Sequence, residues 1–371
     1  MNKRVFKHQT SETGDVPFYK IGTFGKEPDS FISRKLFDEY KSKFPYPLEG
    51  DLLISASGSI GRIVEYSGKD EYFQDSNIVW LQHNGAVVNA FLKQYYSFIE
   101  WAGLEGSTIK RLYNKNILET RIVLPKKEEQ TQIGEYFREL DRLIGLHQRK
   151  HDKLVTLKKA MLQKMFPQPG ATTPEIRFKG FSGEWVEKKV DDICDETYGG
   201  GTPITTERKF WEGKIPWIQS SDITDGEIYR VAPRKYISDL ALRKSPTKFV
   251  PGNSIAIVTR VGVGKLALIE FSYTASQDFL SLSKLKIDLS FAVIALSILL
   301  KSKLHETQGT SIKGITKEEL LAYSFNIPQT IAEQQKIGSY FRTLDELIAQ
   351  HAVQLQKLQQ IKSSCLEKMF V

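Results

Sequence analysis

A segment of 38 residues occurs twice in this chain, and no other feature of the sequence constrains the fold as strongly. Residues 129–166 read EQTQIGEYFRELDRLIGLHQRKHDKLVTLKKAMLQKMF, and residues 333–370 read EQQKIGSYFRTLDELIAQHAVQLQKLQQIKSSCLEKMF. The two copies align without a gap at an offset of 204 residues. Internal repetition of this kind indicates that the chain is built from two similar units.

Each copy has the pattern of a long helix that packs through one narrow stripe. The stripe residues recur in alternating steps of four and three, which is a heptad pattern, and neither copy contains proline. A helix of this length, about 55 Å at 1.5 Å per residue, cannot bury such a stripe against itself. We therefore predict that the two helices form an antiparallel intrachain coiled coil. The predicted stripe consists of Ile133, Phe137, Leu140, Ile144, His147 and Leu154 in the first copy, and Ile337, Phe341, Leu344, Ile348, His351 and Leu358 in the second.

Polar residues also fall on the stripe, at matching positions of the two copies. His147 matches His351, and Lys158 matches Lys362. A metal-binding or catalytic histidine pair is one interpretation. We prefer polar stripe residues that fix the register of the two helices, because that role is common in coiled coils.

The segments that precede the two helices repeat each other more weakly. Pro17-Phe18-Tyr19 corresponds to Pro216-Trp217-Ile218, and a strand pattern at 50–54 corresponds to one at 252–256. Short alternating apolar runs, Gly/Ser turns and short helical patches are typical of an α+β globule. We predict a first globule at 1–125, a helix at 126–166, a linker at 167–174, a second globule at 175–327 and a helix at 328–371. A pseudo-twofold axis between the helices would place the globules at opposite ends of the coiled coil.

Composition favours an intracellular protein with an anionic partner. The formal net charge is +8 and the pI is about 9.1, which favours nucleic acid only weakly. The two cysteines, Cys194 and Cys365, exclude a disulfide framework and suit a reducing cytoplasm. No apolar run approaches the roughly 18 residues of a membrane span, so no membrane anchor is expected.

Motifs for catalysis and metal binding are mostly missing. The sequence has no phosphate-binding loop of the Gly-x-x-x-x-Gly-Lys-Ser/Thr type and no paired Cys or His spacing for zinc. An adenine methyltransferase needs a Pro-Pro-aromatic motif to hold the flipped base, and the chain contains no Pro-Pro. We therefore predict neither catalytic residues nor a metal site.

One pattern keeps a nuclease as an alternative. Asp29 is followed by Glu39 and Lys41, and in a metal-dependent nuclease such carboxylates hold Mg²⁺ while the lysine helps to activate water. The Glu-x-Lys pair should then lie on an apolar strand, whereas residues 36–43 have the pattern of an exposed amphipathic segment.

Basic and hydroxyl-rich loops are the better candidates for a site. Basic residues gather at 34–43 and at 230–248, before the matching strand patterns, and could neutralise DNA phosphates. Loops 55–62 and 259–265 put small residues beside Arg or Lys, so that backbone could approach DNA while the long side chain reaches a base edge. A solvated surface is the alternative for each residue alone, but recurrence in both globules favours DNA contact. The candidates are Arg34, Lys35, Lys41, Lys43, Ser57, Ser59, Arg62, Lys110 and Arg111 in the first globule, and Arg230, Arg234, Lys235, Arg243, Lys244, Thr259, Arg260, Lys265 and Lys313 in the second.

The repeated motif EQxxIGxYFRxLDxLI, the sequence PEIRFKGFSGEW at 174–185 and the plan of two globules and two helices resemble a known family. They are similar, over nearly the full chain, to the DNA specificity subunit of type I restriction-modification enzymes. This resemblance implies that each globule is a target recognition domain for one half of a bipartite double-stranded DNA sequence. It also implies that the helices set the spacing of the halves and bind modification subunits, expected as two copies, through outer-face residues such as Arg138, Arg142, Arg342 and Glu346.

The same resemblance assigns the chemistry to partner subunits. The methyltransferase subunits would carry S-adenosylmethionine, and a restriction subunit would supply motor and nuclease activity, so this chain is expected to bind no cofactor and to be no enzyme. Family members usually open both globules with an EW…KKV…DI segment, which occurs here only at 184–193, so completeness of the first domain does not follow from the resemblance. A stand-alone repressor that binds two DNA sites remains a further alternative.

Overall fold

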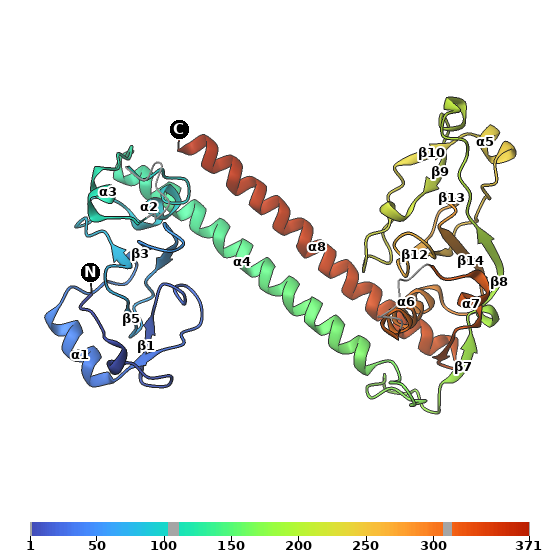
Figure 1. Ribbon diagram of the computed structural model, residues 1–371, viewed down its shortest axis with the longest axis horizontal. Coiled ribbons are helices and arrows are strands. Elements are labelled where there is room, and N and C mark those ends of the chain that lie inside the picture. The colour runs from blue at the N-terminus through green and yellow to red at the C-terminus, as the bar shows by residue number, and fades with distance from the viewer. Residues whose placement is uncertain (1, 103–110, 307–313, 371) are drawn as a thin grey trace. The chain divides into compact units, whose positions relative to one another are not determined.

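The computed structural model describes residues 2–102, 111–306 and 314–370 (Figure 1). By their contacts the residues fall into two compact units. Unit 1 comprises Met1–His147 and Gln354–Val371, and unit 2 comprises Gln148–Val353. This division cuts both long helices, so each unit contains one part of each helix.

Unit 1 has two small sheets. In the first, β1 (Val16–Tyr19) lies between antiparallel β2 (Phe31–Ile32) and parallel β5 (Tyr72–Phe73). In the second, β3 (Leu52–Ser55) lies between antiparallel β4 (Ile63–Glu65) and β6 (Ile78–Trp80). The helical elements are η1 (Lys7–Gln9), α1 (Arg34–Lys43), α2 (Asn89–Tyr95), α3 (Asn114–Glu119) and the first part of α4 (Lys127–Lys164).

Unit 2 contains the same two sheets in an extended form. Strand β9 (Ile215–Ile218) lies between antiparallel β10 (Lys235–Ile237) and parallel β13 (Thr274–Ala275). Strand β11 (Ser254–Val258) lies between antiparallel β12 (Leu266–Ile269) and β14 (Phe279–Leu285), and β8 (Cys194–Gly199) pairs with the outer edge of β14. A separate pair joins β7 (Val186–Lys189) to β15 (Ser324–Ile327). The helical elements are η2 (Asp191–Ile193), η3 (Arg208–Phe210), η4 (Ser220–Asp222), α5 (Asp239–Lys244), α6 (Leu289–Glu306), α7 (Lys317–Ala322) and the first part of α8 (Ile331–Met369).

The weak sequence repeat is therefore a structural repeat. β1 and β9 each have one antiparallel and one parallel neighbour, and β3 and β11 each have two antiparallel neighbours. Strands β7, β8 and β15 have no counterpart among the described strands of unit 1. The fold is α+β, as predicted, with two repeated globules and two long helices.

The long helices begin and end within three residues of their predicted bounds. In the described residues, no helix is both long and apolar enough to cross a membrane. The stripe residues differ in burial along the helices. Ile133, Phe137, Leu140, Ile337, Phe341 and Leu344 are buried, whereas Ile144, His147, Leu154, Ile348, His351 and Leu358 are half-buried.

Each unit is closed by a group of three phenylalanines that combines the start of one long helix with the end of the other. In unit 1, Phe370 of the C-terminus stacks on Phe91 of α2 at 5.0 Å and meets Phe137 of α4 at 5.9 Å. In unit 2, Phe166 stacks on Phe291 of α6 at 5.8 Å and meets Phe341 of α8 at 6.0 Å. The two groups occupy matching positions of the repeat.

Close contact between each long helix and the short helix beneath it depends on glycine. A methyl group on Gly134 would lie 2.8 Å from the backbone nitrogen of Phe91, and one on Gly338 would lie 2.7 Å from that of Phe291. Such distances are too short for any Cβ, so only glycine allows α4 and α8 to approach α2 and α6 in this way.

A buried glutamine fixes the entry to each long helix. The amide nitrogen of Gln130 donates to the carbonyl of Pro125 at 2.9 Å, and its oxygen accepts from the Val88 N–H at 3.0 Å. Gln334 makes the same two bonds, to Pro328 and from Asp288, at 2.9 and 3.0 Å. Each glutamine thus satisfies backbone groups at a helix end that packing removes from water.

Two ion pairs link the helices at symmetry-related positions. Lys362 Nζ lies 2.7 Å from Asp141 Oδ1 in unit 1, and Lys158 Nζ lies 2.5 Å from Asp345 Oδ1 in unit 2. Together with the phenylalanine groups, these pairs show that α4 and α8 run antiparallel. The lysines on the predicted stripe therefore pair with aspartates of the opposite helix.

Cys194 lies in the core of unit 2. Burial raises the pKa of its thiol to about 11, so the thiol is protonated at neutral pH. Cys365 is half-buried, with its sulfur 3.6 Å from the Tyr136 hydroxyl.

The Lys158–Asp345 pair generates a stability prediction. Asp345 Oδ2 is buried and has no hydrogen-bond partner among the described residues, and burial raises the pKa of the carboxyl, opposed by Lys158. We expect Lys158→Met to lower the free energy of unfolding at pH 7 by about 2 kcal/mol, measured by urea denaturation, because Asp345 loses its counter-ion.

The loss should shrink as the pH falls. A carboxyl whose pKa is raised by folding destabilises the folded state as the pH rises through the range between its unfolded and folded pKa values. The exposed neighbour variant Lys159→Met serves as the control, and adding Asp345→Leu to Lys158→Met should recover most of the loss. Equal effects of the two lysine variants would contradict a stabilising ion pair.

Candidate nucleic-acid interface

The β3–β4 loop of unit 1 and the β11–β12 loop of unit 2 have the same backbone frame. In each unit a glycine N–H closes the loop, the first strand residue bonds across it, and the residue two positions after 110 or 313 bonds to the loop. The bonds are Gly61 to Ser55 and Gly264 to Val258 at 3.0 Å, Ser55 to Arg62 at 2.9 Å and Val258 to Lys265 at 2.8 Å, and Leu112 to Ala56 and Ile315 to Thr259 at 2.8 Å. The frame therefore does not depend on the side chains, which differ between the loops.

The closing glycine is required in both loops. Gly61 and Gly264 have φ values of 80° and 89°, in the left-handed region that favours glycine. A Cβ on Gly264 would in addition lie 2.3 Å from the Leu304 side chain. The glycines noted in the sequence thus set the turn itself.

The loop of unit 2 is the more cationic of the two. Arg260 is exposed, and Arg260, Lys265 and Lys301 of α6 line a hollow of about 410 Å³ whose one acidic lining residue is Asp225. In unit 1, Ser57 stands at the position of Arg260, and its hydroxyl bonds to the Asn77 amide oxygen at 3.0 Å. Three cations around one hollow can accommodate a phosphate group.

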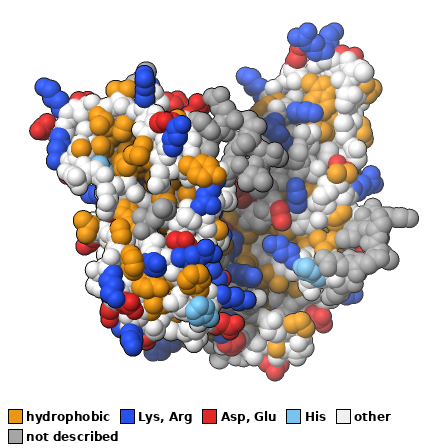
Figure 2. Space-filling view, turned by 60° about the vertical axis from the view of Figure 1, so that its left-hand side comes forward, with side chains coloured by type: hydrophobic (Ala, Val, Ile, Leu, Met, Phe, Trp, Pro, Cys, Tyr) orange, Lys and Arg blue, Asp and Glu red, His pale blue; other side chains and the backbone are white. Residues whose placement is uncertain are grey.

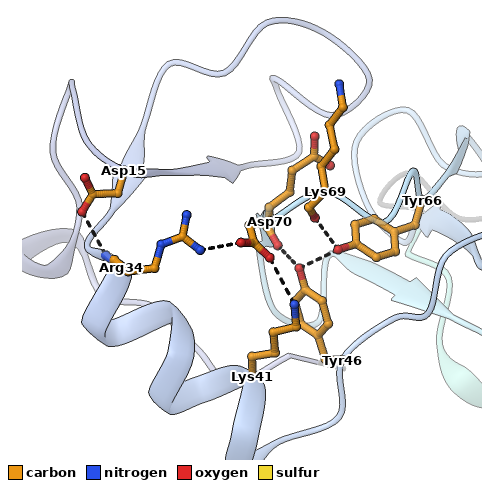
Figure 3. Close-up of polar contacts among 8 residues, drawn as sticks. Asp15, Arg34, Lys41, Tyr46, Tyr66, Lys69 and Asp70 are labelled. Carbon is orange, nitrogen blue, oxygen red and sulfur yellow. Dashed lines mark hydrogen bonds and ion pairs between the residues drawn. The ribbon is translucent and has the colours of Figure 1, made fainter.

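Two of the predicted cations in unit 1 have an internal role. Figure 3 shows Asp70 between Arg34 and Lys41 of α1, with N···O distances of 2.5 and 3.1 Å. Arg34 and Lys41 hold the pKa of the Asp70 carboxyl below its usual range, Arg34 most strongly. The two cations therefore attach α1 to the loop that contains Asp70.

Two tyrosines reinforce this attachment. Their hydroxyls, of Tyr46 and Tyr66, lie 3.0 Å apart, and each donates to a backbone carbonyl, that of Glu71 or Lys69 (Figure 3). Burial raises the pKa of both tyrosines, so both stay protonated at neutral pH. The Arg34 N–H also bonds to Asp15 at 3.2 Å, which fixes the start of α1.

Other predicted residues of unit 1 divide into structural and exposed ones. The Arg62 guanidinium donates to the Phe24 carbonyl at 3.0 Å, and that of Arg111 donates to the Ser76 carbonyl at 3.0 Å. Lys43 pairs with Glu39 at 3.1 Å. Lys35 and Ser59 are exposed. Lys110 lies outside the described residues, as does Lys313 of the second globule.

The same division holds in unit 2. Arg234 is bound to Asp222 at 2.6 Å and to Ser221, and the buried Thr259 hydroxyl donates to the Asp278 carbonyl at 3.0 Å. Lys235 lies over the rings of Trp211 and Trp217, 5.6 Å from each centroid. Arg243 and Lys244 are exposed in the last turn of α5. Arg230 is exposed at a hollow of about 510 Å³ that Asp222, Glu227 and Glu270 also line, so its surroundings are acidic.

The nuclease pattern does not have the geometry that its chemistry needs. Glu39 and Lys41 lie on helix α1, not on an apolar strand, and Lys41 is paired with Asp70. Asp29 is paired with Lys20 at 2.9 Å. In the parts of the chain that the structure describes, no three His, Cys, Asp or Glu side chains form a group that could hold a metal ion.

Sequence reasoning missed two residues that matter for this surface. Lys301 adds a third cation to the hollow beside Arg260, but it follows an apolar run and had no local signal. Asp70 neutralises Arg34 and Lys41 from 36 and 29 residues away, so only the fold brings them together. On the face shown in Figure 2, Lys and Arg side chains are interspersed with acidic and hydrophobic ones.

Comparison with known proteins gives a consistent result. A family model described as "Type I restriction modification DNA specificity domain" matches residues 1–156 and 182–362. The putative type I restriction enzyme MjaX specificity subunit of Methanocaldococcus jannaschii is 25% identical over 340 residues, which is 85% of this chain and 76% of the relative. The putative specificity subunit S.HindORF215P of Haemophilus influenzae is 53% identical over 134 residues, so the match spans 36% of this chain and only 35% of that relative.

A solved structure shares the fold over the whole chain. It is the S subunit of a type I restriction-modification system from M. genitalium, with a TM-score of 0.65, 15% sequence identity, and coverage of 100% of this chain and 92% of that one.

The Asp70 contacts predict a specific pH dependence. An aspartate whose pKa is lowered by folding stabilises the folded state above its unfolded pKa, and this stabilisation is lost as the pH falls through the folded value. We expect the thermal midpoint of the protein to fall as the pH is lowered below about 4. Asp70→Asn should have a lower midpoint at pH 7 and a smaller further loss in acid. Asp38→Asn, on the exposed side of α1, should behave like the unmodified protein, and a profile equal to that of Asp70→Asn would contradict the assignment.

Proposed function

Because the chain belongs to the type I restriction-modification DNA specificity family, we propose that it is a DNA-reading subunit that carries no catalytic site of its own. Each unit reads one half of a bipartite double-stranded target. The observation that carries this proposal is the repeated loop: the two units present the same backbone frame with different side chains. Equivalent positions with different side chains suit two half-sites of different sequence.

In unit 2 the proposed reader is the loop of Arg260 and Lys265, together with Lys301. Lysines there neutralise phosphates, while the exposed Arg260 guanidinium can donate two hydrogen bonds to a guanine edge. In unit 1 the matching loop offers Ser57 and Ser59, and the exposed Lys35 supplies charge. The structural cations Arg34, Lys41, Arg62, Arg111 and Arg234 are not assigned to DNA.

The two long helices are proposed to set the spacing of the half-sites and to bind two modification subunits. Arg138 of α4 is exposed, and Arg142 pairs with Glu139 at 2.7 Å. On α8, Arg342 pairs with Glu270 at 2.9 Å and with Glu346 at 3.4 Å. Such exposed pairs contribute little to stability and remain available to a partner.

The partners supply the chemistry in this proposal. The modification subunits carry S-adenosylmethionine and methylate adenine, and restriction subunits join the same assembly. The cysteine usage fits a cytoplasmic location. An endonuclease at Asp29, Glu39 and Lys41 is not adopted, because Glu39 and Lys41 lie on a helix with other ionic partners. No observation separately favours a stand-alone repressor.

Single-molecule methylation mapping tests the proposal. DNA from cells that express the chain with its modification subunit should carry methylation at a split motif with a fixed gap. Arg260→Ala should relax one half of the motif only, because a bidentate base contact contributes about 1–3 kcal/mol of discrimination. Ser57→Ala, at the matching position of unit 1, should leave that half unchanged. A continuous motif, or a change in both halves on Arg260→Ala, would contradict the proposal.

The spacer role has its own test. Four residues inserted after Lys153 lie between the Asp141 and Lys158 contacts, and lengthen α4 by roughly 6 Å while shifting its stripe by about half a heptad. We expect the recognised gap to change or methylation to stop. The control is a four-residue insertion after Gly170, beyond the end of α4. If the first insertion leaves the gap as it was, the helices do not set it.

A further inference from the structure

In unit 2, residues 175–190 cover the start of α8 through charged and aromatic contacts. Arg177 binds Glu333 with two hydrogen bonds, Nε to Oε1 at 2.7 Å and Nη2 to Oε2 at 2.8 Å. The Glu333 side chain is only 2% exposed as a result. One residue further on, the Phe178 ring meets Tyr340 edge-on at 5.8 Å.

The same segment then closes the core and completes a sheet. Trp185 is 2% exposed and meets the rings of Phe166 and Phe291 edge-on, each at 5.8 Å. Strand β7 follows at once and pairs antiparallel with β15, from Val186 opposite Ile327 to Lys189 opposite Ser324. Arginine, aromatic ring and strand thus form one continuous cover.

Unit 1 has the receiving surface for such a cover but, among the described residues, not the cover. Glu129 matches Glu333 and is exposed, and Tyr136 matches Tyr340 and is also exposed. Residues 121–124 match β15 but form no strand. Leu124 is 41% exposed where the matching Ile327 is 5% exposed, and Val123 is 74% exposed.

The aromatic part of the surface is also present. Phe370 and Phe91 match Phe166 and Phe291, the two rings that Trp185 covers in unit 2. In unit 1, Phe98 meets Phe370 edge-on at 5.1 Å but stays 42% exposed. An added aromatic side chain would therefore cover Phe98 as well as the phenylalanine pair.

We propose that this surface of unit 1, made of residues 121–124, Glu129, Tyr136 and Phe98, binds an extended segment of another polypeptide. The segment has the chemistry of residues 175–190: an arginine for Glu129, an aromatic ring beside Tyr136, a tryptophan eight residues after the arginine, and a strand that pairs with 121–124. Strand addition of this kind combines backbone hydrogen bonds with side-chain pockets. An exposed β-type edge with apolar residues is the surface that such binding protects.

A second copy of this chain is the less suitable donor. Its own residues 175–190 already bind Glu333 and bury Trp185, so moving them to unit 1 of a neighbour would lose as many contacts as it makes. A partner whose segment is otherwise unbound has no such cost. The proposal does not rest on the DNA-reading role, and either can fail without the other.

A synthetic peptide tests the proposal with the full chain. The probe is the sequence of residues 174–191, PEIRFKGFSGEWVEKKVD, with a fluorescent label, and binding is measured by fluorescence anisotropy. We expect saturable binding to one site. Glu129→Gln should weaken it roughly 10- to 100-fold, the effect of losing hydrogen bonds to a charged group. Glu128→Gln, an exposed neighbour in the same helical turn, is the matched control and should bind like the unmodified chain.

Peptide variants test the other contacts. Alanine in place of the arginine or of the tryptophan should abolish measurable binding, and so should proline at the positions of Glu187 and Lys188, because proline cannot join the strand. No binding of the parent peptide would overturn the proposal. So would binding that Glu129→Gln leaves unchanged, since the peptide would then occupy unit 2, and so would sedimentation showing that the chain dimerises through residues 175–190.

Discussion

The two groups of three phenylalanines are the contacts on which the rest of the structure depends. Phe370, the second-last residue, completes a core with Phe91 and Phe137, and Phe166 does the same for Phe291 and Phe341. Each globule is thus closed by parts of two helices that are far apart in sequence. Unit 1 cannot complete its core before the last residues of the chain are present. Contacts of such sequence separation are slow to form and make the first globule depend on the second helix.

The helices and their antiparallel packing could be predicted because their signal is periodic and local. A heptad pattern without proline fixes a helix to within three residues at either end. The partners of the stripe lysines could not be predicted in the same way. Asp141 and Asp345 lie one position after stripe leucines, and only the antiparallel register brings them to Lys362 and Lys158. Periodicity says which face is buried, whereas register between distant segments depends on the whole core.

For the candidate interface, the sequence predicted backbone better than side chains. Glycine and serine marked both loops, and both have the expected tight turns. Clusters of arginine and lysine, by contrast, do not reveal which members are neutralised. Arg34 and Lys41 meet Asp70, Arg234 meets Asp222, and two further guanidinium groups bind backbone carbonyls. Each partner is remote or non-ionic, so charge counting assigned structural cations to DNA.

The repeat also separates what the loop frame needs from what it does not. Unit 2 has β8 beside β14 and β7 beside β15, and the described part of unit 1 has neither, yet the loop hydrogen bonds agree to within 0.1 Å in the two units. The frame is therefore set by the central strand, the closing glycine and the segment that returns to Ala56 or Thr259. Positions such as 57 and 260 lie outside this set of bonds. Their side chains can change, and with them the DNA sequence that is read, while the glycine, the phenylalanine groups and the helix register stay the same.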